Sequence, residues 1–327
     1  MKDPRDFYRG KTVVVAGASG YIASALVERL ADVAAKVVRL SRRPLTPAPG
    51  CADLSGDYAD AAFWARALPG ADAVFHLAAQ TSFYKAAEDP DADFRANVLP
   101  MRALLEACRR EGHRPFVVFS GSTTEAGLPL KTPVDENHPD APVTIYDLHK
   151  LLAEKLLEGY VRQGFARGTT LRLSNVYGPG PRSSSSDRGI LNAMIARALR
   201  GERLTVYGTG EAMRDYLHIE DVAAAFLAAG KGAPALNGRH FVMGSGRGVT
   251  LADSFRLVAE RVASRTGRRV EVASVPEPAG LSPIEARKFV ADSSAFRAAA
   301  DWSPVVALED GVDRTIESQL MSSGNPR

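Results

Sequence analysis

Apolar and polar positions follow two different periods along the first half of the chain. Short runs rich in β-branched and aromatic residues indicate buried strands, at 12–16, 36–40, 73–79, 116–120 and 169–173. Segments with apolar residues at helical spacing lie among them, at 24–30, 94–110 and 145–161. This alternation predicts an α/β fold built on a doubly wound parallel sheet, the Rossmann arrangement.

The pattern changes near Gly178. Residues 179–187 are rich in Gly, Pro and Ser, which predicts a flexible loop, and shorter strands alternate with helices beyond it. We predict a dinucleotide-binding domain over 1–177, to which 211–244 return. The remainder, 178–327, is expected to form a smaller C-terminal α/β substrate-binding cap, chiefly from 178–210 and 245–327.

Composition narrows the class of protein. The chain has 327 residues, 45% of them hydrophobic, which is enough for one large or two modest domains. A net charge of +3, with Lys and Arg scattered along the chain, predicts no nucleic-acid partner. No apolar run approaches membrane length, and Cys51 and Cys108 lack metal-binding or redox spacing. We expect a cytoplasmic protein with reduced thiols, no membrane contact and no metal site.

A glycine-rich turn follows the first strand directly. The turn has the form Gly17-x-x-Gly20-x-x-Ala23 and precedes a helical segment. Gly17 permits the tight turn, Gly20 lets the backbone approach a pyrophosphate, and the small Ala23 allows the helix to pack closely on the strand. Because the free N–H groups of a new helix favour negative charge, this context predicts a dinucleotide cradle.

The end of the second strand selects the cofactor at such a site. The chain places Ser41, Arg42 and Arg43 there, with no acidic residue between Lys36 and Gly50. An acid would bind the ribose 2′-hydroxyl of NAD, whereas arginine forks match a 2′-phosphate. We therefore predict NADPH/NADP, with NAD as the alternative if both arginines are merely solvated. Asp53 and Leu54 are expected near the adenine.

Tyr146 and Lys150 lie four residues apart in a helical segment, on one face. A nearby ammonium favours the phenolate, which lowers the tyrosine pKa toward the working range and allows general acid–base chemistry. Lys150 can also hold the nicotinamide ribose. A hydroxyl from the cluster Ser122, Thr123 and Thr124 is expected to donate a hydrogen bond to a developing alkoxide.

With these motifs, the chain resembles the extended short-chain dehydrogenase/reductases, the NAD-dependent epimerase/dehydratase group that acts on nucleotide sugars. The resemblance covers nearly the whole chain. It rests on the glycine turn, Leu77-Ala78-Ala79, Asn97-Val98, Ser122-Thr123, Tyr146-x-x-x-Lys150, Asn175-Val176-Tyr177-Gly178-Pro179 and the motif from Arg214 to Asp221.

The resemblance implies a role for each matching residue. Tyr146 is the acid/base, Lys150 its partner, Arg214 the clamp on the substrate pyrophosphate and Tyr207 the aromatic on the nucleotide base. Counting from the strand favours Thr123 as the catalytic hydroxyl and counting back from Gly127 favours Ser122; we expect Thr123. The implied cofactor-binding residues also include Ser19, Tyr21, Ile22, Leu77, Ala78, Ala79, Ser120, Asn175 and Val176, and the implied substrate-binding residues are Gln80, Thr81, Thr124, Asn175 and Arg188. The family often dimerises through two helices per subunit, one of which carries the tyrosine, so the resemblance implies a homodimer.

The arginines after the second strand suit an enzyme that consumes reduced cofactor. Dehydratases of this family carry Thr-Asp-Glu where this chain has Thr123-Thr124-Glu125, and the C-terminal segments resemble dTDP-4-keto-6-deoxyhexose 4-ketoreductases. We therefore expect NADPH-dependent reduction of a C4 ketone in deoxysugar biosynthesis for antibiotic glycosides. The alternatives are an NAD-dependent nucleotide-sugar 4-epimerase, a decarboxylase that uses Glu125, and a non-enzymatic NADP-sensing regulator. The Tyr146–Lys150 pair counts against the regulator, and we expect Glu125 to be a solvated loop acid.

Overall fold

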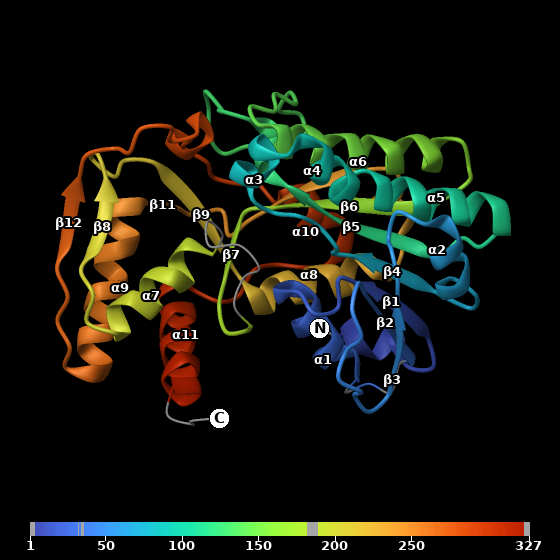
Figure 1. Ribbon diagram of the computed structural model, residues 1–327, viewed down its shortest axis with the longest axis horizontal. Coiled ribbons are helices and arrows are strands. Elements are labelled where there is room, and N and C mark those ends of the chain that lie inside the picture. The colour runs from blue at the N-terminus through green and yellow to red at the C-terminus, as the bar shows by residue number, and fades with distance from the viewer. Residues whose placement is uncertain (1–3, 32, 34–35, 182–188, 324–327) are drawn as a thin grey trace.

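The computed structural model describes residues 4–31, 33, 36–181 and 189–323 (Figure 1). Arg188, expected to bind substrate, lies outside the described residues. Among the residues that are described, no helix is both long and apolar enough to span a bilayer.

Seven parallel strands form the main sheet, in the order β10-β6-β5-β4-β1-β2-β3. Chain order reverses between β1 and β4, and ligands of such sheets bind at the carboxyl ends beside this reversal. The order confirms the doubly wound fold. The strands are β1 (Thr12–Ala16), β2 (Lys36–Ser41), β3 (Cys51–Ser55), β4 (Ala73–His76), β5 (Phe116–Ser122), β6 (Arg167–Leu173) and β10 (His240–Met243).

Helices cover both faces of this sheet (Figure 1). Side chains alternate across β1, so Val13 and Val15 join one core and Val14 and Ala16 join the other. The first core packs under α1 (Tyr21–Ala31), α8 (Ile219–Gly230) and α10 (Ser294–Ala300). The second packs under α2 (Ala61–Ala67), α5 (Leu99–Glu111) and α6 (Ile145–Arg162).

The predicted helix at 94–110 is two helices. After α3 (Phe83–Glu88), α4 (Pro90–Asn97) ends before Val98, and α5 begins at Leu99. Pro100 explains the break, because proline lacks a backbone N–H and is tolerated in the first turn of a helix but not in its interior. The long helix α6 is continuous, as predicted.

A separate apolar core lies among the C-terminal elements, at the end of the molecule away from β3 (Figure 1). Ile195, Phe255, Val258, Val312 and Ile316 are among its buried side chains. Its helices are α7 (Ile190–Leu199), α9 (Leu251–Thr266) and α11 (Leu308–Ser323), and β8 (Leu204–Tyr207) pairs with β12 (Val272–Val275).

A three-stranded sheet, β11 (Gly248–Thr250), β9 (Met213–His218) and β7 (Asn175–Tyr177), has β9 at its centre. Of the segment 211–244, α8 and β10 pack with the main sheet, while β9 belongs to this smaller one. Short 3₁₀ turns complete the fold: η1 (Pro4–Tyr8), η2 (Thr123–Ala126), η3 (Pro234–Leu236) and η4 (Pro283–Ala286).

Candidate active site

The glycine turn fits closely against the end of β4. Gly17 has φ +78°, and a Cβ there would lie 2.8 Å from the backbone N of Ala78. The N–H of Gly20 donates to the Gly17 carbonyl at 2.7 Å, and α1 begins at the next residue. Two glycines without side chains, directly before the N-terminus of an 11-residue helix, let a dinucleotide pyrophosphate approach the backbone, so these residues fit the expected cofactor.

Tyr58 braces this turn, a role that sequence reasoning missed. Its hydroxyl accepts a hydrogen bond from the N–H of Gly17 at 2.8 Å and donates one to the Leu40 carbonyl at 2.6 Å. Burial raises the pKa of Tyr58 to about 12, so the hydroxyl keeps its proton. The residue links the ends of β1 and β2, and nothing in its local sequence indicates this because the three segments meet only in the fold.

The end of β2 carries the expected cofactor-selecting residues. Arg42 and Arg43 are exposed there, and the Ser41 hydroxyl donates to the carbonyl of Arg43 at 2.5 Å. Asp53, expected near the adenine, instead forms a bidentate ion pair with Arg39, with both oxygens 2.7 Å from the guanidinium. Leu54 packs against the core on the α2 side of the sheet.

The other expected cofactor residues lie in several different environments. Ser19 is exposed on the glycine turn, while Ile22, Leu77 and Val176 pack on one core and Ala78 on the other. The Tyr21 hydroxyl donates to the Gly178 carbonyl at 2.7 Å, which links the first helix to the loop after β7. Ala79 is partly buried after β4.

Tyr146 and Lys150 occupy the first turns of α6. The helix starts with a capping box in which Thr144 and Asp147 satisfy each other's backbone N–H groups. Tyr146 is 6% exposed and packs with Phe83 and Ile284. The ammonium of Lys150 donates to the Ser120 carbonyl at 2.5 Å and lies 4.1 Å from the centre of the Phe119 ring. Lys150 is thereby fixed at the carboxyl end of β5.

The three hydroxyls after β5 are engaged differently. The Oγ atoms of Ser122 and Thr124 are 2.7 Å apart and form a hydroxyl pair. Thr123 donates its proton to the carbonyl of Leu173 at 3.2 Å. A hydroxyl that stabilises an alkoxide must donate to it, so this geometry favours Ser122 over Thr123.

Glu125 is fully buried, which contradicts the expectation of a solvated loop acid. Its Oε1 accepts a hydrogen bond from the N–H of Ser122 at 2.7 Å, and its Oε2 lies 3.1 Å from Nε of Arg172. The guanidinium on the neighbouring strand thus provides an opposite charge beside the buried carboxyl, although Nε of Arg172 donates its hydrogen bond to Glu154 and leaves Oε2 of Glu125 without one among the described residues.

Arg214, expected to clamp a pyrophosphate, is 2% exposed. Its guanidinium donates to the carbonyls of Glu285 and Arg287, both at 2.7 Å, and to the Glu285 carboxylate at 3.0 Å. Arg287 in turn donates from Nη2 to Oδ1 of Asn175 at 3.2 Å. Arg287 therefore lies beside both Arg214 and Asn175. Sequence reasoning missed this arginine because no local motif marks it. Tyr207, expected on the nucleotide base, is 48% exposed on β8.

Gln80 belongs to a polar cluster around the buried Asp93. Its amide nitrogen donates to Oδ1 of Asp93 and to the Ser82 carbonyl, each at 2.6 Å. The other oxygen of Asp93 lies 2.7 Å from Nδ1 of His149. The cluster ties the loop after β4, which includes Thr81, to α4 and α6.

Comparison with known proteins decides the family. The profile of the NAD dependent epimerase/dehydratase family matches residues 13–244. The chain belongs to this family. The UDP-glucose 4-epimerase of Mycolicibacterium smegmatis is 29% identical over 316 residues, which cover 93% of this chain and 97% of that protein.

Solved structures of the same family superpose over nearly the full length. UDP-glucose 4-epimerase from Thermotoga maritima, solved with UDP-glucose, gives a TM-score of 0.84 at 27% identity and covers 95% of this chain and 99% of its own. UDP-glucose 4-epimerase from Thermus thermophilus, solved with NAD, gives 0.80 at 28% identity, with 94% and 98% covered.

These relatives overturn the expected 4-ketoreductase function. The relatives that match almost end to end include several UDP-glucose 4-epimerases, so the expectation of a dTDP-ketosugar reductase in antibiotic biosynthesis is wrong. That expectation depended on Arg42 and Arg43. Residues at the end of β2 affect which dinucleotide binds, but they carry no information on the direction of hydride transfer at the sugar.

Proposed function

We propose that the protein is a nucleotide-sugar 4-epimerase whose first substrate to test is UDP-glucose. One observation carries the proposal: Lys150 and the Ser122–Thr124 hydroxyl pair lie at the carboxyl end of β5, on the same edge of the main sheet as the glycine turn, and Tyr146 lies one helical turn before Lys150. Near-full-length relatives of the chain include UDP-glucose 4-epimerases. The acid/base and the hydroxyl are the two groups that oxidation and reduction at one sugar carbon require.

In this proposal Tyr146 removes the proton from the sugar 4-hydroxyl, and Ser122 donates a hydrogen bond to the resulting oxygen. When bound, the nicotinamide supplies a reversible two-electron acceptor for the hydrogen on C4. Lys150 favours the phenolate of Tyr146 through its positive charge. Once the ketone has rotated so that its other face meets the nicotinamide, the hydride would return to C4 and Tyr146 would return the proton to the oxygen. The product then differs only in configuration, and nothing is consumed.

We assign the diphosphate of the substrate to Arg214, with Arg287 beside it. The support is geometric: the chain's own carboxylate and carbonyl groups already orient the Arg214 guanidinium, which reduces the entropy lost on clamping an anion. Tyr207 is assigned to the nucleotide base and Gln80 and Thr124 to the sugar end. The C-terminal core around Phe255 is assigned to a substrate-binding domain, whose boundary with the dinucleotide-binding domain lies near residue 177.

For the cofactor, we propose NADP in place of the NAD that is bound in the Thermus thermophilus relative. The support is the exposed pair Arg42 and Arg43 after Ser41, together with the absence of any acid between Lys36 and Gly50 in the sequence. Because an epimerase returns its electrons, either dinucleotide serves the chemistry, and the arginines alter affinity alone.

We also propose a homodimer that forms through α6. Ile145, Leu148 and Leu152 lie at helical spacing on one face of α6 and are each 36–40% exposed, and Phe94 of α4 is 38% exposed beside them. Covering such an apolar face is the usual outcome of oligomerisation.

The decisive experiment follows UDP-galactose and UDP-glucose by proton NMR of the anomeric signals. The purified protein, with NADP⁺ or NAD⁺ added, should interconvert the two without net change in absorbance at 340 nm. Tyr146→Phe is the matched inactive control. If neither UDP-glucose nor UDP-N-acetylglucosamine is epimerised with either dinucleotide, the proposed function is wrong.

A further inference from the structure

A buried series of charged contacts connects Ser122, Thr123 and Thr124, here called the hydroxyl turn, to the helix that carries Tyr146. Arg172 of β6 is 2% exposed and holds Glu154 of α6 by two bonds, Nε to Oε2 at 2.9 Å and Nη2 to Oε1 at 2.6 Å. Nε of Arg172 also lies 3.1 Å from Oε2 of Glu125, whose Oε1 accepts the N–H of Ser122 at 2.7 Å. The contacts therefore run without a break from Ser122 to α6.

Glu154 occupies a special place on α6. It follows Lys150 by four residues and Tyr146 by eight, so all three side chains lie along one face of the helix. Lys150 already ties this face to the Ser120 carbonyl on β5. The Glu154–Arg172–Glu125 contacts add a second tie, which reaches β5 just beyond the first. Two ties define the orientation of a helix relative to a strand better than one.

Gly121 makes room for this second tie. It pairs with Arg172 in the β5–β6 register, and a Cβ there would lie 2.6 Å from Thr170 Cγ2 and 3.2 Å from both Arg172 Cγ and Glu125 Oε1. A side chain at this position would overlap Thr170 and press on Arg172 and Glu125, so at least one of the three would have to move. The absence of a side chain at Gly121 therefore leaves the space beside β5 that Arg172 and Glu125 fill.

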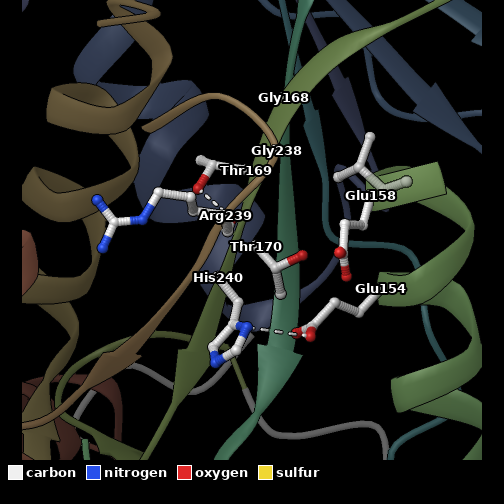
Figure 2. A pocket seen from close by; sticks show the side chains of 9 residues that line it. Glu154, Glu158, Gly168, Thr169, Thr170, Gly238, Arg239 and His240 are labelled. Atoms are coloured by element: carbon white, nitrogen blue, oxygen red, sulfur yellow. Dashed lines mark hydrogen bonds and ion pairs between the residues drawn. The ribbon is translucent and has the colours of Figure 1, made fainter. Parts of the chain in front are cut away.

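The surroundings hold more negative than positive charge. Asp140 contacts Nη1 of Arg172 at 2.7 Å, and Lys155 contacts Asp140 at 3.2 Å. His240 faces Glu154 at 3.4 Å (Figure 2). Burial and the carboxylate of Glu154 raise the pKa of Glu125, while Arg172 and Lys150 oppose that rise. A buried network of this kind contributes little stability compared with apolar side chains of the same volume, so stability alone does not account for it.

We propose that Glu125, acting through Arg172, is a positioning residue that fixes the Ser122 hydroxyl relative to Tyr146 and Lys150. The distance between that hydroxyl and the phenol decides whether both can reach the oxygen on one sugar carbon, and errors of about 1 Å at such positions cost rate rather than binding. The expected effect of Glu125 on catalysis rests on the proposed epimerase function. Its role in holding the segment around Ser122 in place does not.

The test compares Glu125→Gln with a matched control, Glu158→Gln. Glu158 lies one turn beyond Glu154 on α6, and its side chain is 33% exposed. Glu125→Gln keeps the size of the side chain but replaces one of the two oxygens that face Ser122 and Arg172 with an amide NH2 group, which cannot accept a hydrogen bond. We expect its kcat to fall at least tenfold, with KM and the cofactor Kd within twofold of the parent and with Glu158→Gln unchanged. A purely structural role would lower Tm and leave kcat intact below that temperature, which overturns the proposal.

A second variant tests the route through Arg172. Arg172→Lys keeps the charge but cannot hold Glu125 and Glu154 together, because lysine lacks the guanidinium fork. We expect a similar loss of kcat, and we expect the double variant with Glu125→Gln to lose little more than either single one. Fully multiplicative losses would mean that Glu125 does not act through Arg172, and would overturn the proposal.

Amide hydrogen exchange provides a readout that does not depend on turnover. In Glu125→Gln the peptide covering 116–127 should exchange faster than in the parent, while peptides from α9 stay the same. If the parent epimerises no sugar but this peptide loosens, the proposed function fails and the positioning contact stands. Unchanged exchange in 116–127 overturns the positioning role whatever the activity.

Discussion

The ammonium of Lys150 donates a hydrogen bond to the backbone carbonyl of Ser120, across the junction of α6 and β5. The same nitrogen lies over the ring of Phe119. A cation held by one carbonyl and one aromatic face cannot swing out to solvent without losing both contacts. This fixes the charge that acts on Tyr146, one helical turn earlier, at the edge of the sheet where the glycine turn also lies.

Lys150→Met should therefore lower epimerase kcat by a factor of about 100 or more, the usual scale for general acid–base assistance. The pKa of the group that acts as base should also rise, since the ammonium no longer favours the phenolate. The pH profile of kcat measures this shift. As a control, Arg162→Met removes an exposed cation at the far end of the same helix and should change kcat little. An unshifted profile in Lys150→Met would separate Lys150 from the ionisation of Tyr146.

The hydroxyl turn supports a second prediction. Ser122→Ala removes the hydroxyl that pairs with Thr124 and should lower kcat by about 100-fold, the scale of one lost oxyanion donor. Thr123→Val removes a hydroxyl whose proton is given to the Leu173 carbonyl, so its main effect should be on stability. Steady-state kinetics and thermal unfolding of both variants distinguish the two. The reverse ranking of kcat would restore Thr123 as the catalytic hydroxyl.

The proposed preference for NADP rests on Arg42 and Arg43. Replacing both with alanine should weaken NADP⁺ binding by about 10- to 100-fold, since each arginine gives up a charge-assisted contact to the 2′-phosphate. NAD⁺ has no such phosphate, and its affinity should change by less than twofold. Isothermal titration of the two dinucleotides measures both values on one protein sample. Equal weakening of both would indicate general damage to the cradle, and no weakening of either would leave the arginines solvated.

Much of the fold could be predicted because its signals are local. The apolar runs of β1, β2, β4, β5 and β6, the Gly17 turn and the Tyr146–Lys150 spacing each lie within one short segment. The bounds of the edge strand β3 could not be predicted from its sequence, Cys-Ala-Asp-Leu-Ser. This strand has no apolar run, and its side chains are largely exposed. The break at Val98 was signalled by Pro100, whose effect on a helix is well understood.

The remaining site features depend on contacts between distant segments. Glu125 is buried beside Arg172 of the next strand, and Asp53 is paired with Arg39, which lies opposite it in the sheet. Tyr58 braces Gly17 only after β1, β2 and β3 have assembled. A charge or hydroxyl in a loop carries no local sign of such a partner, so sequence reasoning assigns it to solvent.

The buried His76 gives the folded protein a specific pH dependence. The imidazole stacks on Trp64 and meets the edge of Phe119, and burial together with the charge of Lys150 lowers its pKa from 6.5 to about 3. Between these values the unfolded chain binds a proton that the folded chain does not. The free energy of unfolding should therefore fall as pH drops below 6.5, by up to about 1.4 kcal/mol per pH unit from this group.

Urea unfolding at pH 7.5 and pH 5.0 measures this dependence. His76→Asn will change the stability at both values because it alters a buried stack, but the difference between the two should shrink. His138→Asn replaces a histidine at a loop surface and should leave the difference as it is in the parent. If His76→Asn preserves the full difference, another group is responsible for the acid sensitivity.

The proposed dimer gives the last prediction. Leu148→Glu with Leu152→Glu places two charges on the exposed apolar face of α6, and burying them against a second copy would be strongly unfavourable. The double variant should elute as a monomer in size-exclusion chromatography with light scattering, while the parent elutes as a dimer. Leu320→Glu, at a comparably exposed leucine of α11, should leave the dimer intact. Because Tyr146 and Lys150 lie on the same helix, loss of the dimer should also lower kcat through a looser α6. A parent that is monomeric at micromolar concentration, or a double variant that remains a dimer, would contradict this assignment of the interface.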